Sequence, residues 1–316
     1  MVQFVFIGIG AGVASALLFL APLGGTSFAL PLFFLSGLPI AIAGLGWGVV
    51  AAVLAAIVAA AIIGLGIAPP AGGIHLAVFG APLGWLTRMV LLSRSSADGR
   101  TTEWFPLGRL LFHAAIAAAA GTVIAGAIVG FDPAALAADM TGMLTAWMSG
   151  SPELGPPPTA AELAPFVKAN VALMPFTVPA ITLFVTVLSL WLGARIVSAS
   201  GRLARPREPV WTAALPIEAP ILFAIALAVL LLPGAISYVA SAVAGAVAAA
   251  AALAGLAVLH AVTLGTNLRG GILVAAYVAT IFLGLPIFLF ALLGFADTFF
   301  HFRARRSGGA PPPATT

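Results

Sequence analysis

The chain has 316 residues, of which 62% are hydrophobic and 7% are charged. A soluble domain carries about 25% charged residues, so this composition excludes a water-soluble enzyme, and its hydrophobicity excludes a disordered chain. The net charge of +4 does not indicate a nucleic-acid partner, because the bases lie in short loops between apolar segments. With no cysteine, the chain has no disulfide and no thiolate metal site. A multi-pass membrane protein remains.

About 20 apolar residues in a helix cross the hydrocarbon core. We therefore predict an all-α, polytopic bundle of about eight to ten membrane segments, forming a single transmembrane domain over residues 1–300. The predicted helices are 4–20, 40–66, 74–93, 107–130, 171–198, 213–232, 235–262 and 270–299. Between the first two, the short apolar segment 26–38 either spans the membrane or re-enters it.

Segment 131–168 is acidic, and we expect it outside the membrane as an amphipathic interfacial helix. Asp132 is its predicted N-cap, with Pro133 at the first helical position. The proline-rich residues 152–158 then interrupt the helix.

Most of the arginines lie in two loops and in the tail 301–316, which we predict to be cytoplasmic, basic and then disordered. An unbroken helix over 270–299 would leave this tail outside. A break at Leu283-Gly284-Leu285-Pro286 would instead make a hairpin of two half-length segments and return the tail to the cytoplasm.

No motif in the chain indicates catalysis. The glycine-rich run 4–13 resembles a dinucleotide-binding turn, but no acid follows until Asp98. There is no phosphate-binding loop of the nucleotide-hydrolase type, no pair of histidines at a metal-ligand spacing and no nucleophile–histidine–acid set. We predict no enzyme activity, no cofactor and no metal.

Polar residues within a membrane are costly and therefore functional candidates. Glu218 lies near a helix start, where the helix dipole favours an acid. Asp297 is predicted to pair with Arg303 or another arginine as an interfacial anchor. The expected ligand-pocket residues, between the N-terminal helices and 165–198, are Thr26, Ser27, Trp147 and Asn170.

Small residues recur at four-residue spacing, which lets helix backbones approach closely. They are Gly8, Gly12, Ala51, Ala55 and Ala59. The favoured interpretation is packing inside the bundle. The alternative is an exposed face that docks a partner helix.

The C-terminal pattern LLGFADTFFHFR at 292–303 resembles the ending of the YybS-like family of bacterial membrane proteins, which has no assigned activity. The matching positions are Gly294, Asp297, Phe299, Phe302 and Arg303. The resemblance implies a location in the bacterial inner membrane and a fold similar to the S components of energy-coupling factor transporters. Those proteins bind a vitamin or metal in the membrane and rely on a separate coupling protein and ATPases. This chain is longer, and no vitamin-specific residues carry over.

Two functions follow as hypotheses. The first is a transporter-like subunit that binds a small molecule and has no ATPase of its own. The alternative is a non-transporting scaffold that binds other membrane proteins through its small-residue faces and its outer helix. A polar cavity favours the first hypothesis, and a dry, packed bundle favours the second.

Overall fold

The computed structural model describes residues 2–96, 101–150 and 158–303. This part of the chain is almost entirely helical, which confirms the all-α prediction, and six of its helical segments are long and apolar enough to cross a membrane. The elements are α1 (Val2–Leu20), η1 (Ala21–Gly24), α2 (Ala29–Phe34), α3 (Leu38–Trp47), α4 (Val49–Gly66), α5 (Pro69–His75), η2 (Leu76–Gly80), α6 (Ala81–Val90), β1 (Ser93–Ser95), β2 (Thr102–Trp104), α7 (Leu107–Val129), α8 (Pro133–Ser149), α9 (Ala160–Ala199), η4 (Val210–Thr212), α10 (Glu218–Val229), α11 (Ala235–Val262), α12 (Arg269–Leu283) and α13 (Pro286–Phe300).

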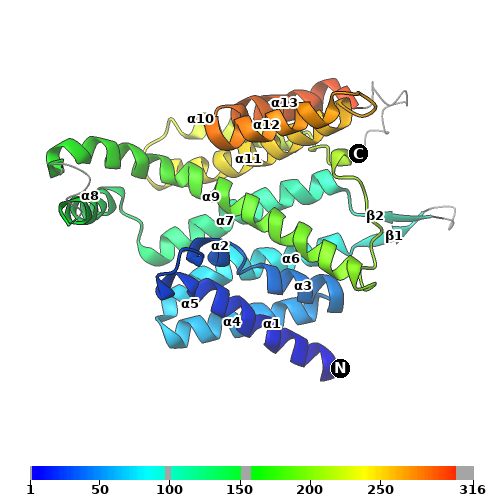
Figure 1. Ribbon diagram of the computed structural model, residues 1–316, viewed down its shortest axis with the longest axis horizontal. Coiled ribbons are helices and arrows are strands. Elements are labelled where there is room, and N and C mark those ends of the chain that lie inside the picture. The colour runs from blue at the N-terminus through cyan, green and yellow to red at the C-terminus, as the bar shows by residue number, and fades with distance from the viewer. Residues whose placement is uncertain (1, 97–100, 151–157, 304–316) are drawn as a thin grey trace.

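The two ends of the bundle differ in charge. Helix α8 lies at one end, and the β1–β2 hairpin lies at the opposite end beside the connection from α9 to α10 (Figure 1). The hairpin end, called the basic end below, carries arginines on β1, on the last turns of α9 and on the connection that follows: Arg94, Arg195, Arg202, Arg205 and Arg207. The α8 end carries Asp132, Asp139 and Glu162. Such an asymmetry is typical of the two sides of a membrane, and the chain is a multi-pass membrane protein.

The N-terminal third divides at a different place from the prediction. Helix 40–66 was predicted as one element, but the chain turns at Gly48, so that α3 ends at Trp47 and α4 begins at Val49. Gly48 has a φ of +94°, a conformation that glycine adopts without a steric penalty. The second candidate membrane span is therefore formed by α2 and α3 together, Ala29–Trp47. The predicted segment 26–38 covers only the first part of this span.

Helices α8 and α9 form a hairpin at the acidic end. The Asp132 carboxylate accepts the backbone N–H of Ala134 at 2.8 Å, which confirms the predicted N-cap. Helix α9 starts at Ala160, earlier than the predicted 171, because Thr159 and Glu162 form a capping box. Residues 160–168 thus belong to this long helix and not to a separate external segment, and residues 151–157 lie outside the described part.

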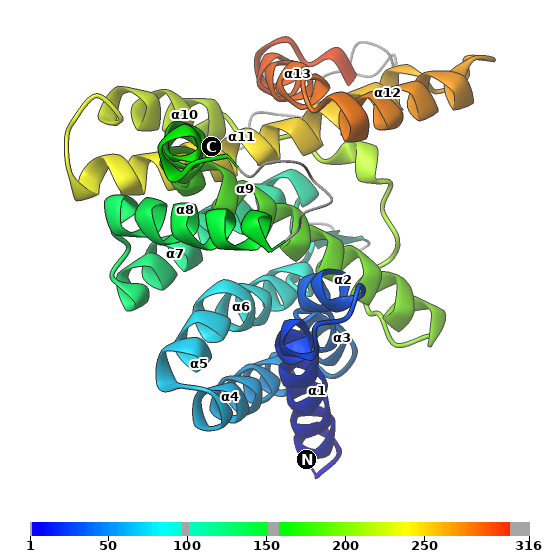
Figure 2. The ribbon, with the colours of Figure 1, turned by 60° about the vertical axis from the view of Figure 1, so that its left-hand side comes forward.

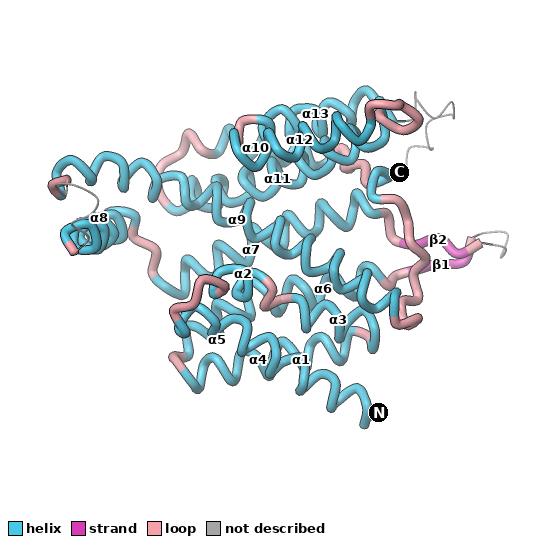
Figure 3. The backbone as a smooth tube through the Cα atoms, viewed as in Figure 1, coloured by secondary structure: helices cyan, strands magenta, loops and turns pink. Residues whose placement is uncertain are grey.

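The C-terminal apolar run is a broken hairpin and not one helix over 270–299. Helix α12 ends at Leu283, Gly284 has a φ of +68°, and α13 begins at Pro286 (Figure 3). The first residue of α12 and an arginine that follows α13 both reach Trp211, which lies at the basic end. The Arg269 guanidinium lies 5.8 Å from the Trp211 ring centroid, and Arg303 Nη1 donates to the Trp211 carbonyl at 3.0 Å. The chain therefore returns to the end at which α12 begins. Residues 304–316 of the predicted tail lie outside the described part.

Helix α11 is the most buried of the six long segments. It packs against α7, α9, α10 and α13, and Figure 2 shows α11 beside α10 and α9. Its backbone approaches α13 closely: a Cβ built on Gly294 would collide with the Ala251 carbonyl, and one on Gly255 with the Phe290 carbonyl. This reciprocal contact is typical of parallel helices that cross at small residues.

Candidate functional site

The four residues predicted to form a ligand pocket do not line the two cavities described below. Thr26 and Ser27 are exposed in the turn before α2, and Trp147 is exposed on α8. Asn170 is exposed on α9, where its amide donates to the Phe166 carbonyl at 2.9 Å. Their role in binding stays a prediction.

The polar residues predicted near the C-terminus do meet. Arg303 Nη2 lies 2.6 Å from Asp297 Oδ2, and both side chains are largely buried. The same arginine bonds the Trp211 carbonyl, so the pair ties the end of α13 to the segment that precedes α10. Glu218 is exposed as the first residue of α10, which agrees with the expectation of a helix-terminal acid.

The small residues predicted for packing or docking form an internal interface between α1 and α4. Ala51, Ala55 and Ala59 are fully buried. A Cβ on Gly12 would lie 2.7 Å from the Ala55 carbonyl, and one on Gly8 would lie 3.0 Å from the Leu54 side chain. In this structure α1 and α4 cover this face with each other, as the favoured packing interpretation expects.

A large cavity of about 730 Å³ lies at the basic end, among segments that are far apart in the sequence. Its apolar floor comes from three long helices: Leu111 and Ala114 on α7, Val187 and Leu190 on α9, and Leu253 and Ala257 on α11. The connection from α9 to α10 lines the mouth of the cavity between residues 203 and 213. We call this space the α7–α9–α11 cavity.

The mouth of the α7–α9–α11 cavity is basic. Three arginines and one glutamate line it: Arg195, Arg205, Arg207 and Glu208. The Arg205 side chain is only 5% exposed. Its Nε and Nη2 donate to Glu208 Oε1 at 3.2 and 2.9 Å, and its Nη1 donates to the Val90 carbonyl at 3.4 Å. These bonds fix a guanidinium where the apolar floor meets the surface.

The other two arginines of the mouth are more exposed. The Arg195 guanidinium lies 5.4 Å from the ring centroid of Trp191, one helical turn earlier on α9. Arg207 Nε donates to Ser198 Oγ at 3.1 Å. Neither forms an ion pair with a carboxylate in the described part of the chain, so the mouth has an excess of positive charge.

A residue of α11 and a residue of α12 line the side of the α7–α9–α11 cavity. His260 Nε2 and the Tyr277 hydroxyl lie 2.9 Å apart, and both residues line the cavity. Helix α12 has no buried residue, so this contact and the stacking of Arg269 on Trp211 hold it beside the cavity.

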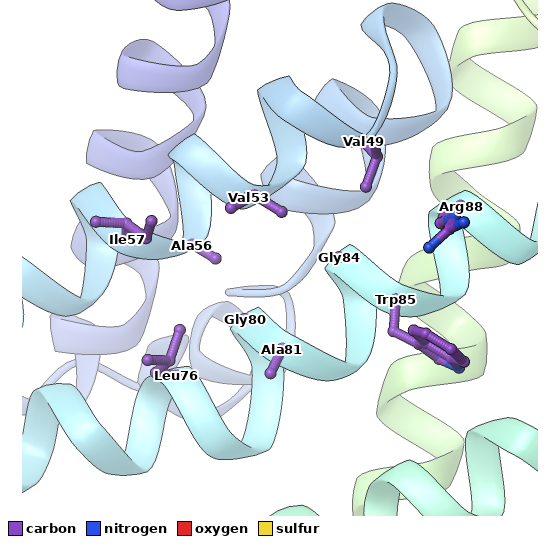
Figure 4. Close-up of a pocket in the computed structure, with 10 residues that line it drawn as sticks. All are labelled: Val49, Val53, Ala56, Ile57, Leu76, Gly80, Ala81, Gly84, Trp85 and Arg88. Atoms are coloured by element: carbon purple, nitrogen blue, oxygen red, sulfur yellow. The ribbon is translucent and has the colours of Figure 1, made fainter.

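A smaller cavity of about 330 Å³ lies between α4 and the helix that runs through η2 and α6. Its walls are apolar, with Gly80 and Gly84 leaving space opposite Val53, and Trp85 and Arg88 lie together at one end (Figure 4). Arg88 is the one charged residue among its ten lining residues. This space therefore offers little that would select a ligand.

A buried polar cluster joins α1, the α2–α3 break and α5. Ser15 Oγ donates to the Ser36 carbonyl at 2.7 Å and lies 3.0 Å from His75 Nε2. Since the hydroxyl has one proton and the carbonyl takes it, His75 Nε2 must carry the hydrogen that Ser15 accepts. Two phenylalanine rings, Phe19 and Phe79, contact the imidazole, and Phe33 packs on both of them. The cluster fixes the broken α2–α3 segment against its neighbours.

Comparisons with protein-family models, with curated proteins and with solved structures found no match. Function is therefore inferred from the geometry of the α7–α9–α11 cavity. Sequence reasoning treated Arg195, Arg205 and Arg207 as a topology signal only, because positive loops are common at membrane surfaces. The one local signal was the spacing of Trp191 and Arg195, four residues apart on a helix, where side chains meet.

Proposed function

We propose that this protein is a membrane-embedded, transporter-type subunit that binds a small molecule with a largely apolar body in the α7–α9–α11 cavity. The observation that carries the proposal is the cavity of about 730 Å³ among α7, α9 and α11, open at the basic end, within the range of roughly 300–1,000 Å³ that is typical of ligand sites. A scaffold that binds its partners through exposed helix faces does not require such a space.

Two features support a transporter role over a free-standing pump. The sequence has no phosphate-binding loop for ATP, so energy would come from a partner. The resemblance to the YybS-like family, and through it to S components of the bacterial inner membrane, fits a binding subunit of this kind. The coupling protein and ATPases remain the expected partners.

The test is to fill the cavity and to follow bound small molecules by native mass spectrometry of protein purified gently from its own membrane. Ala114→Leu and Ala257→Leu place bulk into the floor, since both alanines are buried and line the cavity. Ala146→Leu on the exposed face of α8 is the matched control. We expect a bound molecule in the wild type and in the control, and its loss in the filled variants. A wild type without ligand, or filled variants that keep it, refutes the proposal.

A second candidate, the scaffold, is favoured by α12. None of its residues is buried, and Phe282 and Ile281 are 80% and 76% exposed, so one partner helix would find a free apolar face. If Phe282→Ser removes a stoichiometric partner while the cavity of the wild type holds no ligand, the scaffold function replaces the first proposal.

A further inference from the structure

The charges at the mouth of the α7–α9–α11 cavity indicate the chemistry of its ligand. Three arginines and one glutamate line this mouth, which leaves a surplus of two positive charges. The floor below them is aliphatic. A ligand that complements both parts has an apolar body and an anionic head group.

Arg205 separates this mouth from an ordinary basic loop. Arginines of the cytoplasmic side are normally exposed and solvated, whereas the Arg205 side chain is 5% exposed and lies in the cavity wall. Placing a guanidinium there costs solvation energy, which the partially exposed Glu208 carboxylate and the Val90 carbonyl offset only in part. The Nε–H and Nη2–H groups of Arg205 both donate to the same oxygen, Glu208 Oε1.

Arg195 lies near the end of α9, and Arg207 follows Arg205 on the connection to α10; both line the same mouth. Each is positioned by a neutral neighbour, the Trp191 ring and the Ser198 hydroxyl respectively. Their charges are therefore oriented without being neutralised. Guanidinium groups match the oxygens of phosphate, which accepts several charge-assisted hydrogen bonds at once.

We propose that the α7–α9–α11 cavity binds an amphiphile with a phosphate head group. The apolar chain lies on the floor formed by α7, α9 and α11, and the phosphate lies between Arg195, Arg205 and Arg207. This inference rests on the proposed function and names the ligand class of the same site. A phosphate dianion matches the two surplus positive charges of the mouth.

The experiment compares two lipids that differ only in the phosphate, dioleoyl phosphatidate and dioleoylglycerol, with inorganic phosphate as a third probe. Binding to the full chain in detergent is measured by native mass spectrometry and by titration. We expect phosphatidate to bind at least about tenfold more tightly than dioleoylglycerol, since one or two charge-assisted hydrogen bonds have this effect. Inorganic phosphate alone is expected to bind more weakly than phosphatidate. If it binds as tightly, the site takes a free anion and the proposed amphiphile is wrong.

The variants are Arg195→Gln and Arg207→Gln, because both side chains are exposed and neither forms an ion pair in the described part of the chain. Arg94→Gln is the matched control: Arg94 is an exposed arginine of the β1–β2 hairpin, at the same end but outside the cavity. Each cavity variant should weaken phosphatidate binding about tenfold and leave dioleoylglycerol binding unchanged. The Arg94→Gln control should bind both lipids as the wild type does.

The two proposals fail in different ways. Equal binding of both lipids, unaffected by the arginine variants but lost in Ala114→Leu, overturns the phosphate head group and keeps the cavity as a ligand site. Binding of phosphatidate that persists in Ala114→Leu and Ala257→Leu places the lipid elsewhere and overturns this inference, whereas the proposed function is overturned only if the filled variants also keep the molecule that co-purifies with the wild type.

Discussion

The crossing of α11 and α13 makes a sharp prediction about stability. Gly294 lies where the two backbones touch: a Cβ added there would collide with the Ala251 carbonyl oxygen and lie 3.0 Å from the Gly255 nitrogen. Ordinary van der Waals contact begins at 3.4 Å. Because the obstacles are backbone atoms and not the tips of flexible side chains, Gly294→Ala must push α13 away from α11.

The magnitude follows from the kind of strain. Overpacking a well-packed contact costs about 1–3 kcal/mol, and we expect the upper part of this range, since α13 has no other extensive contact in the described chain. The movement would also separate Phe295 from Phe223, whose ring centroids are 4.9 Å apart, and would weaken the link from Arg303 to Trp211.

The assay is reversible chemical unfolding in detergent micelles, followed by circular dichroism. Gly142→Ala is the matched control, because Gly142 lies in the middle of α8 and nothing surrounds its Cβ position within 4 Å. Alanine is favoured over glycine in a helix by about 0.5–1 kcal/mol, so the control should be neutral or more stable. If Gly294→Ala unfolds with the same free energy as the wild type, the close contact of α11 and α13 does not exist.

Three further variants test other contacts, each by the same unfolding measurement. Asp297→Asn removes the carboxylate that Arg303 faces at 2.6 Å and should lower the free energy of unfolding by about 3–5 kcal/mol. The double variant with Arg303→Gln should lose less stability than the single variant. A larger loss in the double variant would contradict a direct ion pair. Ser15→Ala leaves the buried His75 Nε2 without its acceptor and should cost about 1–3 kcal/mol, whereas an unchanged stability would show that the hydrogen bond is absent. Gly48→Ala forces a Cβ into a φ of +94° and should cost about 1–3 kcal/mol, and a neutral result would mean that α3 and α4 join differently.

Much of the architecture was predictable from local sequence. Apolar length and the scarcity of charge give membrane helices because an unpaired backbone group in lipid is too costly for any other element. The break near Gly284-Leu285-Pro286 was readable for the same kind of reason, since proline removes a donor and glycine permits the turn. The Asp132 cap followed from a single side chain and its neighbours.

Other boundaries were not readable from local sequence. The turn at Gly48 lies inside a uniformly apolar run, where α3 and α4 fold back and pack against each other and against α1 and α6. The start of α9 was also predicted at 171, eleven residues late, and the helix continues through Pro165, Pro175 and Pro179, as transmembrane helices permit when surrounding groups satisfy the freed carbonyls.

The sequence by itself determined the class of this protein, its helical elements and the segregation of its charges, because these depend on composition and on neighbours along the chain. Tertiary structure alone decided the site. The α7–α9–α11 cavity joins the end of α6, three long helices, the connection after α9 and Tyr277 of α12. Which of many exposed arginines faces an apolar space depends on how helices separated by up to a hundred residues or more pack together, as in the bond from Arg205 to the Val90 carbonyl. No local sequence pattern encodes a contact between residues so far apart in the chain.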